Sequence, residues 1–244
     1  MARSSQRVGL GRLRKRREVE EDFTGRLVTI LDPTSAASEA YRTLRTNLLY
    51  SLIDTPPKVI VLTSPGPSEG KSTTCANLGV VLAQAAKRVV ILDCDLRKPV
   101  IHKFFGLRNL HGITDLLIGE RSLEEVWEEP VEGLKVVPAG PIPLNPAEVL
   151  GSRRFSEFLT NFREEFDYVL VDASPVGPVS DPVVLASKGD GVLLVLDAQN
   201  TRQASVRQAM DSMRAVGANV LGTVMNNAQV SPGNYYYYGP TYDE

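Results

Sequence analysis

Hydrophobic residues in this chain form short continuous runs that alternate with longer amphipathic stretches. Apolar runs of about four to eight residues, rich in β-branched side chains, predict strands that are buried on both faces. They lie at 58–63, 88–92, 134–137, 168–171, 191–196 and 219–225. Helical periodicity separates them, most clearly at 72–86, 152–166 and 202–216. This alternation predicts an α/β fold, a doubly wound and mostly parallel sheet flanked by helices.

The same pattern divides the chain into three parts. Residues 1–33 show little periodicity and predict a flexible arm, residues 34–228 carry the domain, and residues 229–244 form a flexible tail rich in tyrosine. No apolar run approaches the roughly 18 residues of a membrane-spanning helix, and the start lacks the apolar segment of a secretory signal. The two cysteines, Cys75 and Cys94, cannot build a disulfide framework. We therefore expect a cytoplasmic protein.

Charge is balanced over the chain but uneven along it. The 244 residues have a formal net charge of −2, with 43% hydrophobic and 23% charged residues, which excludes a wholly disordered chain and gives no reason to expect a nucleic-acid partner. The first 17 residues contain no acid and seven basic side chains: Arg3, Arg7, Arg12, Arg14, Lys15, Arg16 and Arg17. Such an arm either contacts an anionic surface or stays solvated, and its composition fits both.

A glycine-rich segment, SPGPSEGKST, connects the first predicted strand to a helix at 64–73. Gly70, Lys71 and Ser72 match the closing half of a P-loop, in which backbone N–H groups hold phosphates, the lysine supplies a positive charge and the hydroxyl binds Mg²⁺. The first glycine of that pattern is replaced by Pro65, and Gly66 follows it. The simpler alternative is a turn that only caps the helix. The predicted nucleotide contacts are Gly66, Ser68, Glu69, Gly70, Lys71, Ser72 and Thr73.

Three aspartates follow two other predicted strands. Asp93 and Asp95 follow the strand at 88–92, and Asp172 follows the strand at 168–171. In a parallel sheet all three lie at the same edge as the P-loop. We predict that Asp172 and Asp95 bind Mg²⁺ with Ser72, and that Asp93 orients or deprotonates a nucleophile. Taken singly, each aspartate is equally typical of a helix N-cap or a turn.

The stretch at 35–52 is an amphipathic helix with an apolar stripe of Tyr41, Leu44, Leu48 and Leu52. Glu39 lies opposite the stripe, Arg42 follows three residues later, and Arg45 lies at the edge of the stripe. These three residues either form ion pairs on a surface helix or contact a neighbouring subunit.

The last ten residues contain five of the eight tyrosines, Tyr235, Tyr236, Tyr237, Tyr238 and Tyr242. Glycines and prolines bracket them and oppose regular structure. Phenol hydroxyls are acceptors that a phosphoryl transferase can use, so we predict phospho-acceptors. The alternatives are an aromatic end that packs on the surface or a platform for stacking single-stranded nucleic acid.

Together, SPGPSEGKST, ILDCDLRKP and YVLVDASP resemble the bacterial tyrosine kinases of capsule and exopolysaccharide synthesis. Asp93, Asp95 and Arg97 fit the D-x-D-x-R motif of that family. Residues 39–45 are similar to its E-x-x-R-x-x-R oligomerisation motif, residues 140–152 to one of its loops, and the tail to its tyrosine cluster. Related partition and septum-site ATPases carry a signature lysine where this chain has Gly66, which favours the kinase branch.

The resemblance implies an ATP- and Mg²⁺-dependent tyrosine autokinase with a partition-ATPase-like P-loop fold, acting mainly between subunits. Lys71, Asp93 and Asp95 would be catalytic, and Asn226 matches a position that contacts the base. It also implies a homo-oligomer, for which a ring is one arrangement, and a membrane activator of the chain-length-regulator type whose cytoplasmic segment recruits the kinase to the plasma membrane. Further tyrosine substrates stay open. The rival functions are a positioning ATPase without protein phosphorylation and an adaptor that only binds ATP.

Overall fold

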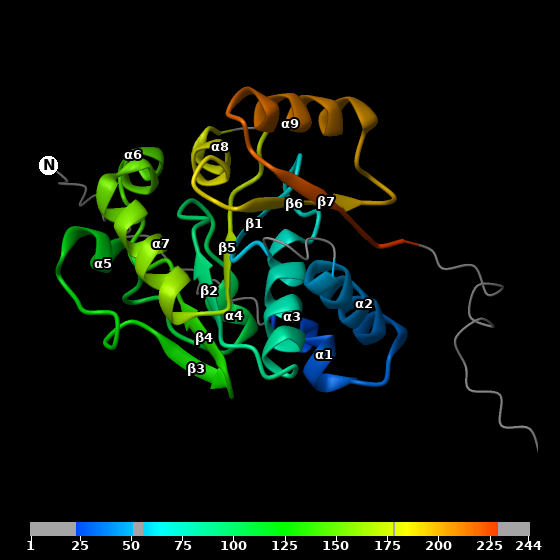
Figure 1. The fold of residues 1–244 in the computed structure, drawn as a ribbon, viewed down its shortest axis with the longest axis horizontal. Helices are drawn as coiled ribbons and strands as arrows, with labels where there is room; N and C mark the ends of the chain where they lie inside the picture. The colour runs from blue at the N-terminus through cyan, green and yellow to red at the C-terminus, as the bar shows by residue number, and fades with distance from the viewer. Residues whose placement is uncertain (1–22, 51–55, 178, 229–244) are drawn as a thin grey trace, which may run out of the picture.

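The computed structural model describes residues 23–50, 56–177 and 179–228, which form a three-layer α/β structure (Figure 1). Within these ranges one sheet has the strand order β3-β4-β2-β5-β1-β6-β7. The strands are β1 Val59–Thr63, β2 Val89–Asp93, β3 Glu128–Val131, β4 Leu134–Val137, β5 Tyr168–Asp172, β6 Gly191–Asp197 and β7 Val220–Asn226. All neighbouring strands run parallel except β3 and β4.

The helices of the described ranges cover both faces of the sheet. They are a 3₁₀ turn, η1 Thr24–Arg26, and α1 Val28–Leu31, α2 Ala36–Tyr50, α3 Lys71–Ala83, α4 Ile101–Phe104, α5 Ile113–Ile118, α6 Pro146–Gly151, α7 Arg153–Glu165, α8 Asp181–Ala186 and α9 Gln203–Ala215. In Figure 1, α1 to α4 lie on one side of the sheet and α5 to α9 on the other. Local sequence explains several ends: Ser152 accepts a hydrogen bond from the Phe155 N–H at the start of α7, and Gly119 ends α5 in a left-handed conformation.

Two apolar clusters hold the layers together. Along β1, Val59 and Val61 belong to the cluster with α5 to α9, whereas Ile60 and Leu62 belong to the cluster with α2, α3 and α4. Because successive side chains of a strand point to opposite faces, both faces of this strand are covered. The continuous apolar runs of the sequence are therefore explained by burial on both sides, and the predicted doubly wound sheet is confirmed.

The structure adds one strand that the pattern did not indicate. β3 is largely exposed, contains Pro130 and pairs antiparallel with β4 at the edge of the sheet. An exposed edge strand needs no apolar run, and proline is tolerated there because one side of the strand has no partner. Its sequence, EEPV, therefore carried no strand signal.

Part of the stretch that the sequence assigned to a flexible arm packs on the domain. η1 and α1 lie within residues 1–33, and both Leu27 between them and Thr29 of α1 are buried. Asn77 of α3, fully buried, accepts hydrogen bonds from the N–H and hydroxyl of Thr29 and donates to the carbonyls of Arg26 and Thr73. The arm prediction now concerns only residues 1–22, which lie outside the described residues.

Replacing Asn77 by Ala should lower the free energy of unfolding by about 2–4 kcal/mol, because it leaves buried polar groups of Thr29 and Arg26 without partners. Urea unfolding followed by circular dichroism measures this. Gln84→Ala is the matched control, since Gln84 is exposed and makes one bond, of 3.3 Å, to the Thr29 carbonyl. Equal effects of the two substitutions would contradict a special role for Asn77.

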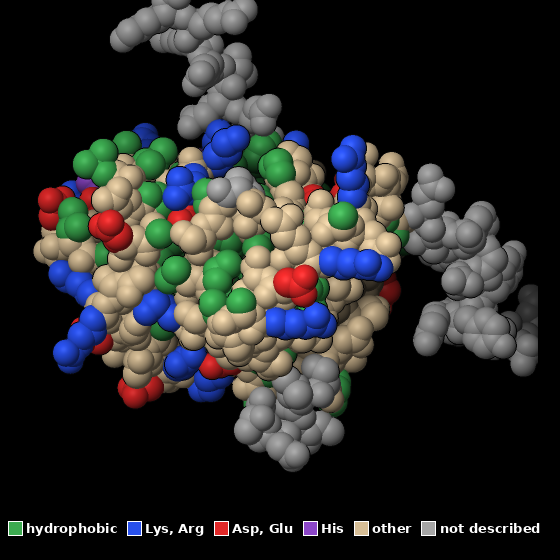
Figure 2. All heavy atoms as spheres, turned by 90° about the horizontal axis from the view of Figure 1, so that it is seen from above, with side chains coloured by type: hydrophobic (Ala, Val, Ile, Leu, Met, Phe, Trp, Pro, Cys, Tyr) green, Lys and Arg blue, Asp and Glu red, His purple; other side chains and the backbone are tan. Residues whose placement is uncertain are grey.

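The surface is mixed in character. On the face shown in Figure 2, basic and acidic side chains are interspersed with neutral and hydrophobic ones. In the part of the chain that the structure describes, no helix combines the length and the apolar character that crossing a membrane requires.

Candidate active site

The P-loop connects β1 to α3 at the carboxyl edge of the sheet. α3 begins at Lys71, directly after Gly70, whose φ of 91° lies in the left-handed region. A Cβ at Gly70 would lie 1.9 Å from Nδ2 of Asn226. Glycine is therefore required at this position for two separate reasons, backbone conformation and space.

Hydrogen bonds inside the loop hold its shape. The Glu69 carboxylate accepts from the N–H of Gly66 at 3.1 Å, and the Ser64 hydroxyl donates to the Gly66 carbonyl at 2.6 Å. Ser68 has a φ of 63°, an unusual value for a residue with a side chain. The N–H of Gly66, predicted to contact phosphate, is thus directed to Glu69 in this structure. Burial raises the pKa of Glu69.

Strand order brings the three predicted carboxylates to Lys71. β5 lies between β1 and β2, and Asp172 pairs in register with Asp93. The Lys71 ammonium lies 2.9 Å from the Asp95 carboxylate and 3.3 Å from that of Asp172. The Ser72 hydroxyl donates to Asp172 at 2.6 Å. Four residues that are spread over a hundred positions of sequence therefore share one cluster.

Asp93 lies beside this cluster and is fully buried. One of its carboxylate oxygens accepts the N–H of Ile101 at 3.0 Å, and the other has no hydrogen-bond partner among the described residues. Burial raises the pKa of Asp93 well above its usual value, and repulsion by Asp172 adds to the shift. A buried carboxylate with a free oxygen and a raised pKa is suited to accept a proton.

The charges of Lys71 and Asp172 depend on each other. Burial alone would lower the pKa of Lys71, but attraction by Asp172 and Asp95 outweighs it and raises the pKa above the usual range. Burial raises the pKa of Asp172, which Lys71 partly opposes. The lysine is therefore held as a cation at the start of α3, where the helix dipole also favours bound anions.

The donor atoms of this cluster fit Mg²⁺ and a nucleotide. Ser72, Asp95 and Asp172 present one hydroxyl and two carboxylates, the hard oxygen donors that Mg²⁺ takes together with phosphate oxygens. Among the described residues there is no group of three or more His, Cys, Asp or Glu side chains arranged to hold a metal by themselves. Bound Mg²⁺ would neutralise charge on the transferring phosphate, and Lys71 and the N–H groups at the start of α3 would orient it.

The remaining predicted residues lie in three places. Thr73 follows in the first turn of α3, and the side-chain amide of Asn226, at the end of β7, donates to the Glu69 carbonyl at 3.2 Å. On α2, Glu39 pairs with Arg42 at 2.8 Å, whereas Arg45 donates to the Val81 carbonyl of α3 at 3.1 Å. The predicted phospho-acceptors Tyr235, Tyr236, Tyr237, Tyr238 and Tyr242 lie outside the described residues.

The sequence analysis assigned no role to several residues near the site. Arg97 forms two hydrogen bonds, of 2.6 and 3.1 Å, with the buried carboxylate of Asp181 at the start of α8. This pair anchors the segment that carries Asp95. Phe23 and Arg26 reach the P-loop because Asn77 holds their segment on α3. The arginine of D-x-D-x-R was visible as part of a motif, but no local signal marks Phe23, Arg26 or Asp181.

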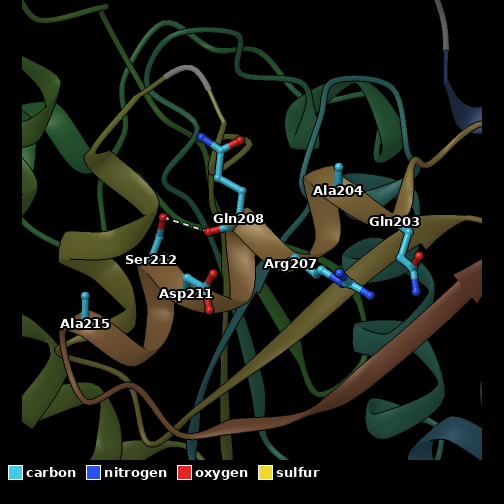
Figure 3. A pocket seen from close by; sticks show the side chains of 7 residues that line it. All are labelled: Gln203, Ala204, Arg207, Gln208, Asp211, Ser212 and Ala215. Atoms are coloured by element: carbon cyan, nitrogen blue, oxygen red, sulfur yellow. Dashed lines mark hydrogen bonds between the residues drawn. The ribbon is translucent and has the colours of Figure 1, made fainter.

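A depression of about 680 Å³, separate from the P-loop, lies on the outer face of α9 (Figure 3). A single helix lines it, with Gln203, Arg207 and Asp211 spaced one turn apart. The hydrogen bond drawn there, from the Ser212 hydroxyl to the Gln208 carbonyl, belongs to the helix itself. The depression contains none of the predicted site residues, and we assign no ligand to it.

A parallel sheet in which Gly70, Lys71 and Ser72 join β1 to α3, with aspartates at the ends of neighbouring strands, defines a P-loop NTPase. In agreement, a family model described as "ParA: NUBPL iron-transfer P-loop NTPase" matches residues 54–234. Tyrosine-protein kinase YwqD of Bacillus subtilis (strain 168) is 38% identical over 215 residues, covering 87% of this chain and 91% of that protein. This chain belongs to the bacterial tyrosine kinases, a branch of the ParA-type P-loop NTPases.

Two further similarities agree with this assignment. A putative tyrosine-protein kinase, EpsB of Ralstonia solanacearum, is 38% identical over 212 residues, and the chain spans only 28% of its length. The crystal structure of the chimerical protein CapA2B2 has a TM-score of 0.81 and 33% sequence identity, covering 84% of this chain and 90% of that one. The chain is therefore an ATP:protein-tyrosine phosphotransferase by family, as the sequence predicted.

Proposed function

We propose that this chain is an Mg²⁺-dependent tyrosine autokinase that regulates the synthesis or export of a capsular polysaccharide or exopolysaccharide. Its acceptors are the tyrosines at 235–238 and 242, modified mainly between subunits. The observation that carries the chemistry is the buried Asp93, whose free carboxylate oxygen lies beside the cluster of Lys71, Asp95 and Asp172. Lys71 stabilises the phosphates, Ser72, Asp95 and Asp172 hold the metal, and Asp93 takes the proton of the tyrosine hydroxyl.

The proposed cellular setting rests on the family resemblance. The kinase works in the cytoplasm, at the inner face of the plasma membrane. A membrane protein of the chain-length-regulator type recruits and activates it through a cytoplasmic segment. Subunits associate through α2, where Glu39 and Arg42 are presented to solvent.

The decisive experiment changes Tyr235, Tyr236, Tyr237, Tyr238 and Tyr242 together to Phe. Phosphotyrosine formed with ATP should fall to about a tenth or less of wild type, because the rings remain and only the acceptor hydroxyls are lost. Mixing this variant with Lys71→Met protein should restore the label, and only on the Lys71→Met chains. ATP affinity is measured in parallel and should be unchanged.

Tyr50→Phe is the matched control, since Tyr50 is 70% exposed and lies on α2. It should retain full label. Full label in the five-Phe variant would contradict the tail as acceptor. Lys71→Met chains that stay unlabelled in the mixture would contradict transfer between subunits. ATP hydrolysis without any phosphotyrosine in the wild type would instead favour the positioning ATPase.

Arg42→Ala should shift an oligomeric wild type toward monomer, because it removes a partly exposed cation from the proposed interface. Within the chain it breaks the ion pair with Glu39 and the hydrogen bond to the Pro33 carbonyl. Light scattering at matched protein concentration measures the shift. Arg153→Ala is the control, since it breaks an ion pair of the same length, 2.8 Å, with Glu157 on α7, although its arginine is more exposed than Arg42. An unchanged mass for Arg42→Ala would contradict association through α2 and would mean that residues 39–45 only form a surface helix.

A further inference from the structure

A cavity of about 280 Å³ lies at the P-loop, and four separate parts of the chain line it: residues 23–26, the P-loop at 67–73, residues 95–104 and Pro175. Lys71, Ser72 and Asp95 belong to the cluster assigned to phosphate and metal. The segment before α1 contributes Phe23 and Arg26, the loop after β2 contributes Lys98 and Val100, and the end of α4 contributes Phe104. The reacting groups therefore share one space with residues from outside the P-loop.

Size and lining suit an amino-acid side chain. Ligand pockets usually measure about 300–1,000 Å³, so this cavity holds a side chain with a phosphoryl group more readily than a whole nucleotide. Phe23 and Phe104 pack with ring centroids 5.3 Å apart, and Val100 extends the apolar wall. An aromatic acceptor would contact this wall while its hydroxyl reaches Asp95 and Lys71.

Two cations of the cavity are not used by the catalytic cluster. The Arg26 guanidinium lies 4.2 Å from the centroid of the Phe23 ring, and Asn77 fixes the Arg26 carbonyl. The N–H of Lys98 donates to Asp95 at 3.1 Å, which fixes the backbone of Lys98 next to the reacting groups. Both side chains are otherwise exposed. Stacking on a ring leaves the N–H groups of a guanidinium free to bind an anion at its edge.

The charge of the lining points in the same direction. Three cations, Arg26, Lys71 and Lys98, face one carboxylate, Asp95, so the lining carries a net charge of +2. Lys71 is already paired with Asp95. The positive charge that remains belongs to Arg26 and Lys98 and is available to a group that enters from outside.

We propose that Arg26 and Lys98 bind an anionic group on a residue next to the acceptor tyrosine, so that the kinase prefers acidic or already phosphorylated acceptor segments. This inference rests on the proposed kinase function and adds the specificity of its acceptor site. The chain itself contains both kinds of anion source, since Asp243 and Glu244 follow Tyr242, and Tyr235 to Tyr238 are adjacent to one another. Carboxylate and phosphate are recognised by the same charge-assisted hydrogen bonds.

The test uses peptides, so that it does not depend on the tail being an acceptor. Three acceptors share one tyrosine and differ in its neighbours, which are Gln, Glu or phosphotyrosine. For the wild-type protein at low ionic strength, kcat/KM should be about 5- to 10-fold higher with either anionic neighbour than with Gln. Comparison of the Glu and phosphotyrosine peptides distinguishes the two anion sources.

In the double variant Arg26→Gln, Lys98→Gln this ratio should fall to about 1–2, through the KM of the anionic peptides. Arg26→Lys should retain part of the preference. Lys103→Gln is the matched control: its ammonium lies 5.9 Å from the same Phe23 ring, but it does not line the cavity. It removes one positive charge close to the cavity, half of what the double variant removes, and should leave the ratio unchanged.

Three results would overturn the inference. They are equal kcat/KM for all three peptides, a preference that survives in the double variant, and a loss of ATP affinity in the double variant without a change in the ratio. The last of these results would show that Arg26 and Lys98 bind the nucleotide. Failure of the proposed function has a different signature, since a wild-type protein that phosphorylates none of the peptides is no tyrosine kinase, whatever its cavity binds.

Discussion

Lys71→Met should slow phosphoryl transfer about 10²- to 10³-fold, equivalent to roughly 3–4 kcal/mol of activation free energy. The substitution removes the cation that lies 2.9 Å from Asp95 and that would bind the negative charge of the transferring phosphoryl group. Nothing else in the cluster replaces it, because Ser72 and the two aspartates carry no positive charge. Single-turnover transfer to a tyrosine-containing acceptor peptide, at saturating ATP, measures the loss.

The same change also affects folding. Without the ammonium, the buried carboxylates of Asp95 and Asp172 lose their counter-charge, so the rate must be expressed per folded molecule, with thermal unfolding measured on the same sample. Lys87→Met is the control, since Lys87 lies two residues before β2, at the opposite edge of the sheet. Transfer by folded Lys71→Met protein at the wild-type rate would refute the P-loop assignment.

Asp93→Asn should slow transfer at saturating ATP by about 10²-fold or more, with a much smaller effect on nucleotide binding. The amide keeps the shape of the side chain and can still accept the N–H of Ile101, but it cannot take a proton from tyrosine. Nucleotide titration beside single-turnover transfer separates the two effects. A variant that loses ATP affinity yet transfers normally once saturated would show that Asp93 is not the base.

The same substitution should stabilise the protein at pH 8. Because burial raises the pKa of Asp93 above its unfolded value of 3.8, the folded state holds this proton more tightly, and the stability that it contributes is lost as pH rises through the folded pKa. The asparagine variant avoids that loss. We expect its unfolding free energy to exceed that of wild type by about 1–3 kcal/mol at pH 8 and by less at pH 5.

Asp167→Asn controls for this effect because it lies next to the opposite end of β5. Its hydrogen bonds with Arg88 lower the pKa of Asp167, so its contribution is present at neutral pH and is lost as pH falls. That variant should be slightly less stable than wild type at pH 8 and should transfer phosphate normally. If Asp93→Asn is less stable than wild type at pH 8, the ionised carboxylate of wild-type Asp93 is favourably solvated in the folded protein.

Much of the active site could be predicted because its signals are local. The continuous apolar runs located six of the seven strands, and Gly70, Lys71 and Ser72 identified the loop that follows the first of them. Asp93, Asp95 and Asp172 could be placed at the same edge because parallel strands end together. β3 could not be predicted, since an exposed edge strand with a proline has no distinguishing pattern.

The sequence by itself determined the fold class, the phosphate-binding loop and the presence of carboxylates near it, since each depends on residues close together in the chain. Only the tertiary structure decided which of these groups touch. Placing β5 between β1 and β2 brings Asp172 to Lys71, and the buried amide of Asn77 brings Arg26 to the cavity from 51 residues away. Such pairings depend on strand order and long-range packing, which local periodicity does not encode, because the same apolar run can lie at any position of the sheet.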